Sequence, residues 1–116
     1  MNPETVEISV AVLNFDAESR VFRDVFREIE ALVHTRNEFT IGEPEFAMGW
    51  YFFTVSVSRG MIVKLANLLG NEFLVVKGKS FENKFVNWLS ARLKKLGYRP
   101  YLHLKSEIET SKYGLF

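Results

Sequence analysis

The 116-residue chain contains no cysteine and no glutamine. The lack of cysteine excludes disulfides, thiolate metal sites and a cysteine nucleophile. No apolar run approaches 18 residues, so we expect no membrane-spanning helix. The first residues, 1–4, lack the basic and apolar regions of a signal peptide, which makes a cytoplasmic location the expectation. The absence of glutamine and cysteine, with many charged residues, is typical of thermophilic proteins.

The composition predicts one folded domain, because 47% of the residues are hydrophobic and 25% are charged. We expect this domain over residues 1–104 and a polar tail over 105–116. The net charge of +1 is unevenly distributed: residues 1–57 carry ten acidic and four basic residues, and residues 58–116 carry eleven basic and four acidic residues. This asymmetry predicts a basic surface that meets either phosphates or the acidic surface of another copy.

Hydrophobic spacing predicts alternating strands and helices. Helices are expected at 16–34, with Asp16 as N-cap, at 60–69, and at 80–96, with Ser80 as N-cap. Strands are expected at 5–13, 37–41, 45–48, 50–58, 72–76 and 98–104. Pro44 lacks a backbone donor and predicts that the interrupted second strand lies at a sheet edge.

This element order predicts an α+β fold with a ferredoxin-like βαββαβ antiparallel sheet and an additional C-terminal helix and strand. The added elements either widen the sheet or fold over its open face.

The most aromatic stretch, 48–57, alternates between two faces. One face is that of an ordinary core strand and carries Tyr51, Phe53, Val55 and Val57. The other face carries Trp50 and Phe52, which a strand buried on only one side does not need. Either another element covers these two rings or they bind a partner.

Two segments resemble the signatures of the RNA-recognition motif family. Met48-Gly49-Trp50-Tyr51-Phe52-Phe53-Thr54-Val55 is similar to the aromatic signature of the family's third strand, and Val10-Ala11-Val12-Leu13-Asn14-Phe15 is similar to its second signature. The resemblance covers about residues 5–78. It implies that Trp50 and Phe52 stack on bases of single-stranded RNA or DNA.

The sequence departs from the family pattern at three positions. Ala11 replaces a stacking aromatic residue, Met48 replaces a basic residue and Tyr51 replaces a small one. The alternative is that the last helix or a second subunit packs on Trp50 and Phe52.

Basic residues of the C-terminal half form a second candidate site. A track beside the aromatic strand would neutralise phosphates non-specifically, whereas an isolated lysine face would only aid solubility. Its candidate members are Lys77, Lys79, Lys84, Lys94, Lys95, Arg99 and Lys105.

Arg92 is unusual because it falls within the apolar arc of the predicted helix 80–96. A buried arginine requires a carboxylate, a phosphate or a route for its head group to water. A structural ion pair or snorkelling is the favoured interpretation, and contact with nucleic acid is the alternative.

Catalytic patterns are weak. His34 and His103 are far apart in the chain, and no phosphate-binding glycine loop, metal-ligand spacing or nucleophile motif occurs. We therefore predict no cofactor and no metal. The leading hypothesis is a small non-catalytic nucleic-acid-binding module. The alternative is a self-associating structural or regulatory domain, with the aromatic face as the interface of a homo-oligomer.

Overall fold

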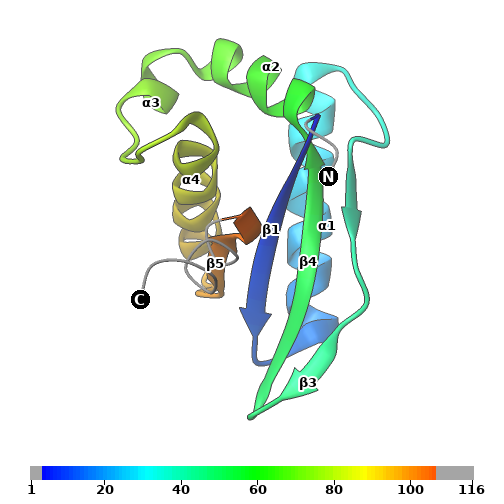
Figure 1. The fold of residues 1–116 in the computed structure, drawn as a ribbon. Helices are drawn as coiled ribbons and strands as arrows, with labels where there is room; N and C mark the ends of the chain where they lie inside the picture. Colours follow the sequence, from blue (N-terminus) through cyan, green and yellow to red (C-terminus); the bar gives the residue numbers. More distant parts are fainter. Residues whose placement is uncertain (1–3, 107–116) are drawn as a thin grey trace.

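A computed structural model describes residues 4–106 (Figure 1). The fold is α+β, with a five-stranded antiparallel sheet and several helices. The elements in chain order are β1 (Thr5–Val12), α1 (Phe15–Val33), β2 (Phe39–Ile41), β3 (Glu45–Ala47), β4 (Trp50–Ser58), α2 (Arg59–Leu69), α3 (Asn71–Leu74), α4 (Phe81–Lys95) and β5 (Tyr101–Leu104). Most of the expected tail, residues 107–116, lies outside the described residues.

The strand order is β2-β4-β1-β5, and β3 also pairs with β4. β2 pairs with residues 55–57 of β4, and β3 pairs with residues 50–52. Between them the amide of Gly42 donates to the carbonyl of Thr54 at 2.8 Å. A Cβ on Gly42 would lie 3.1 Å from that oxygen, so glycine suits the close approach. β2 and β3 are therefore two halves of one bent edge strand, which confirms the expectation from Pro44.

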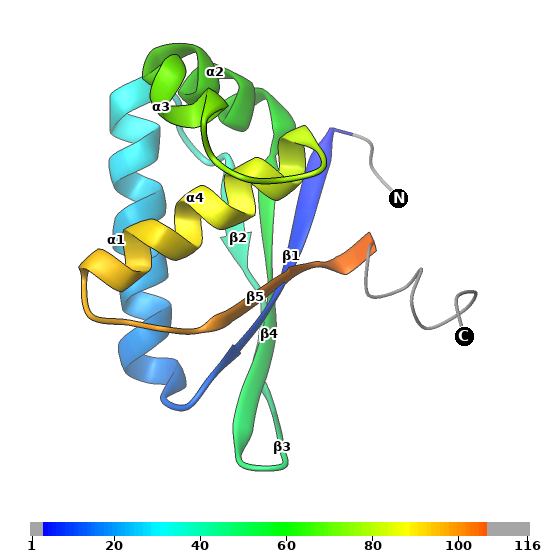
Figure 2. The ribbon, with the colours of Figure 1, turned by 90° about the vertical axis from the view of Figure 1, so that its left-hand side faces the viewer.

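The core lies on one side of the sheet. The side chains of β1 and β4 that face it alternate in sequence, as predicted, because successive side chains of a strand point to opposite faces. Helices α1, α2 and α4 cover this side (Figure 2). Its buried residues include Ile8, Val10, Phe53, Val55, Phe22, Phe26, Ile62, Leu65, Phe85, Leu89 and Leu93.

The N-cap of helix α1 lies two residues earlier than the sequence predicts. The Asn14 side chain accepts a hydrogen bond from the amide of Ala17 at 3.1 Å, and the Glu18 carboxylate accepts one from the amide of Asn14 at 3.2 Å. Asn14 is therefore the N-cap. The prediction of Asp16 as N-cap is wrong, because Asp16 already lies in the first turn.

The strand predicted at 72–76 is also wrong. This segment forms the short helix α3 instead, with the amides of Phe73 and Leu74 donating to the carbonyl of Gly70 at 3.1 Å. Phe73 is buried, whereas Leu74 and Val75 are exposed. A short apolar run does not distinguish a strand from a helical turn, and here one buried ring anchors the turn.

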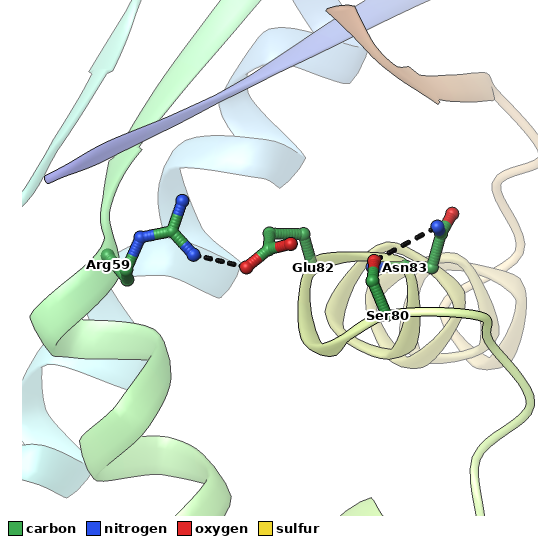
Figure 3. Close-up of polar contacts among 4 residues, drawn as sticks. All are labelled: Arg59, Ser80, Glu82 and Asn83. Carbon is green, nitrogen blue, oxygen red and sulfur yellow. Dashed lines mark hydrogen bonds and ion pairs between the residues drawn. The ribbon is translucent and has the colours of Figure 1, made fainter. Parts of the chain in front are cut away.

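The last helix, α4, belongs to the helical layer, and the last strand, β5, belongs to the sheet. Ser80 caps α4, as predicted, by accepting from the amide of Asn83 at 3.1 Å. An ion pair between Arg59 and Glu82 joins the start of α2 to the start of α4 (Figure 3). α4 packs with the other helices, and β5 pairs with β1 at the edge of the sheet. Because no strand forms at 72–76, this helix and strand are not the additions to a complete βαββαβ sheet that the sequence predicts. Among residues 4–106, no helix has the length and apolar character that crossing a bilayer requires.

Candidate interaction surface

No helix within residues 4–106 covers the side of the sheet opposite the core, and we call this side the open face. Residues that are paired across neighbouring strands form rows that run across this face, perpendicular to the strands. Phe52 of β4 lies opposite Ala11 of β1, and Ala11 lies opposite Tyr101 of β5. Glu45 of β3 extends this row beyond Phe52. The next row consists of Thr54, Ser9 and His103.

Aromatic rings flank the small side chain of Ala11. Phe52 is 44% exposed and Tyr101 is 59% exposed. Trp50 is half-buried, and its ring meets the ring of Tyr101 edge-on at a centroid distance of 5.3 Å. The open face therefore presents three rings from two strands that do not pair with each other.

A shallow hollow of about 620 Å³ lies over this part of the sheet. Ser9 and Ala11 contribute small side chains to its lining, and the larger side chains of Phe52 and Tyr101 also line it. Such a shape suits a bulky apolar group that enters between the two rings. Its polar lining includes Glu43, Glu45 and His103.

The two edges of the open face differ in charge. Glu43 and Glu45 are exposed on the β2–β3 edge, and neither has an ion-pair partner within residues 4–106. The β5 edge carries Arg99, just before the strand, then His103 and Lys105. Lys105 is partly neutralised, because its Nζ lies 3.7 Å from a carboxylate oxygen of Glu7.

The structure brings three of the predicted site residues together. Trp50 and Phe52 both lie on the open face, and Trp50 shares a second hollow, of about 370 Å³, with Arg99. Leu13 and Tyr98 also line this second hollow.

Of the predicted basic track, Arg99 and Lys105 lie at the β5 edge of this surface, but the other five members do not reach it. Lys77 and Lys79 lie in the loop before α4, while Lys94 and Lys95 lie at the end of that helix, which packs on the other side of the sheet. Lys84 has a structural role: its Nζ donates to the carbonyls of residues 74 and 76 at 2.9 and 2.8 Å.

Arg92 forms an ion pair with Glu28 of α1. Both side chains are partly exposed, so the guanidinium reaches water at the edge of the helical layer. The favoured interpretation of Arg92 as a member of a structural ion pair is confirmed. Its partner, 64 positions away in the chain, was not identifiable from helical spacing.

Sequence reasoning missed Tyr101 as part of the aromatic surface. The alternation of Tyr101, His103 and Lys105 in the last strand was a usable signal for a shared face. Which face they share with β4 follows only from the pairing of β5 with β1.

Within residues 4–106 no group of three or more histidine, aspartate or glutamate side chains is arranged to hold a metal ion. Comparisons of the chain with protein-family models, curated proteins and solved structures find no match. Function is therefore inferred from the geometry and charge of the open face.

Proposed function

We propose that this protein is a self-associating domain whose open sheet face is the interface between two copies. The observation that carries the proposal is the row of Phe52, Ala11 and Tyr101, in which two exposed rings flank a small residue. A sheet face with this pattern offers both a projecting ring and a space for the ring of a second copy. One surface can then serve both partners, as a two-fold interface requires.

Charge supports this choice over nucleic acid. Glu43 and Glu45 line the hollow beside the rings, and carboxylates there repel phosphates. Most of the lysines belong to α4 and the loop before it, on the helical side of the sheet. A second copy is favoured because the basic β5 edge can meet the acidic β2–β3 edge.

Light scattering coupled to size exclusion tests the proposal. Wild-type protein is expected to elute as a dimer whose fraction falls on dilution, and Phe52→Lys is expected to give a monomer. The matched control is Leu32→Lys, because Leu32 is 49% exposed on α1, on the helical side. This control should remain dimeric. A wild type that is monomeric at high concentration overturns the proposal.

Single-stranded RNA or DNA is the second candidate partner. It is favoured by the rings of Trp50, Phe52 and Tyr101, which no helix within residues 4–106 covers and which lie beside the basic residues of the β5 edge. Aromatic platforms next to a basic track are typical of single-strand binders. Tyr101 lies next to Ala11, the position where the resemblance to the RNA-recognition motif lacks a ring.

A titration with a fluorescently labelled oligonucleotide tests this candidate. Binding is expected to weaken steeply as salt is raised, because phosphate contacts release counterions. Trp50→Ala should reduce the affinity, whereas Lys94→Ala, on the helical side, should leave it unchanged. Absence of binding at low salt rejects nucleic acid as the partner.

We further infer that the fold is ferredoxin-like. The support is that β1 and β4 are central neighbours, β5 pairs with the other edge of β1, and the helices share one face. In this interpretation β2 and β3 together supply one edge strand, and the segment from α2 to α4 is the second helical connection.

A further inference from the structure

The open face has a polarity that restricts how two copies can pair. Its acidic residues, Glu43 and Glu45, lie on the β2–β3 edge, and its basic residues, Arg99 and the partly neutralised Lys105, lie on either side of β5. These edges are separated by β4 and β1. A face-to-face dimer can therefore align either unlike or like edges, depending on the direction of its symmetry axis.

We propose that the two copies are related by a two-fold axis that runs parallel to β1, between the two open faces. This inference rests on the proposed self-association and adds the arrangement of the partner. Rotation by 180° about such an axis exchanges the two edges of the sheet. Each row of residues keeps its position along the strand direction. The acidic edge of each copy then lies against the basic edge of the other, twice in the dimer.

The same operation matches large side chains with small ones. With the axis between β4 and β1, the row of Glu45, Phe52, Ala11 and Tyr101 meets its own reversed image. Phe52 of one copy then faces Ala11 of the other and enters the hollow between the rings. Glu45 of one copy faces Tyr101 of the other, within reach of Arg99.

The competing arrangement has its axis in the plane of the interface but perpendicular to the strands. That operation places the acidic edge against the acidic edge and the basic edge against the basic edge. Like charges across an interface are unfavourable. The strand-parallel axis is the arrangement that the charge distribution of the open face supports.

Cross-linking distinguishes the two axes, and the absence of native cysteine makes single-cysteine variants simple to use. Facing sheets pack about 10 Å apart, so a thiol-specific linker of about that reach is suitable. A mixture of Glu45→Cys and Arg99→Cys chains is expected to give a cross-linked heterodimer, and Glu45→Cys alone should give none. The control mixture pairs Arg99→Cys with Leu74→Cys, at an exposed position on α3, and should not cross-link.

The outcomes separate the inference from the proposed function. If light scattering shows a dimer but Glu45→Cys cross-links to itself, the strand-parallel axis is wrong and self-association stands. A dimer without either cross-link also overturns the axis. If wild-type protein is monomeric, the proposed function itself fails.

Charge exchange provides an independent test. Glu43→Lys with Glu45→Lys, or Arg99→Glu with His103→Glu, should each weaken dimerisation about tenfold or more in low salt, because like charges then face each other across the interface. One chain that carries all four substitutions exchanges the two edges and should recover the wild-type affinity. A perpendicular axis instead predicts that neither two-site variant weakens dimerisation, because like edges meet in the wild type as well, and that result overturns the proposal.

Discussion

Phe52 and Phe53 are adjacent in β4 and face opposite sides of the sheet, so truncation of each to alanine separates interface from core. Phe52 is 44% exposed on the open face, whereas Phe53 is 4% exposed in the core. Phe53 meets the rings of Phe15 and Phe22 edge-on at 5.1 and 5.8 Å. The same chemical change therefore removes an exposed ring in one variant and a packed ring in the other.

The two substitutions are expected to reduce different free energies: that of dimerisation for Phe52→Ala and that of folding for Phe53→Ala. A phenylalanine side chain has about 200 Å² of surface, so the exposed part of Phe52 amounts to about 90 Å² and its burial to about 2 kcal/mol per copy. Two copies in a dimer lose about 4 kcal/mol, or a factor of about 1,000 in Kd. Truncation of a buried phenylalanine instead costs about 3–5 kcal/mol of folding free energy.

Two assays measure these quantities: analytical ultracentrifugation gives the dimer Kd, and urea unfolding at a concentration where the wild type is monomeric gives the stability. Phe52→Ala should raise Kd with little change in the unfolding midpoint. Phe53→Ala should lower the midpoint substantially, and Phe53→Leu provides a milder variant if the alanine form does not fold. Equal losses of stability in the two variants would refute the assignment of the faces, and an unchanged Kd for Phe52→Ala would refute the interface.

Three further predictions concern local features. Met48 is 96% exposed with a φ of 54°, so Met48→Asn should raise the free energy of unfolding by about 0.5–1 kcal/mol, measured by urea denaturation, because asparagine tolerates this conformation better. Lys84→Met should speed hydrogen exchange in the loop between α3 and α4, since the lysine satisfies two main-chain carbonyls there; unchanged exchange would argue against that role. A double-mutant cycle on Arg92 and Glu28 should give a coupling below about 1 kcal/mol that falls in high salt, because both side chains are partly exposed.

Local sequence signals predicted the parts of the fold that depend on neighbouring residues. The alternation in β1 and β4 identified which side chains point to the core, and Pro44 identified a bent edge strand. Ser80 was correctly identified as an N-cap. These features depend on residues close together in the chain, where backbone geometry restricts the possibilities.

The segment around Phe73 shows where this reasoning fails. Four consecutive apolar residues fit a buried strand as well as a helical turn. The outcome depends on Phe81, whose ring lies 5.5 Å from that of Phe73, and on Lys84, which binds the carbonyls after the turn. Both partners come from α4, so no local pattern contains the deciding contact.

The sequence by itself determined that Trp50 and Phe52 share a face of β4 and that acidic and basic residues separate along the chain. Only the tertiary structure decided that α4 packs with the other helices, which leaves those rings open among the described residues. It also decided that Tyr101 joins them, through the pairing of β5 with β1, and that the lysines of α4 lie elsewhere. The physical reason is that strand pairing and helix packing depend on surfaces distant in sequence, which spacing within one segment does not encode.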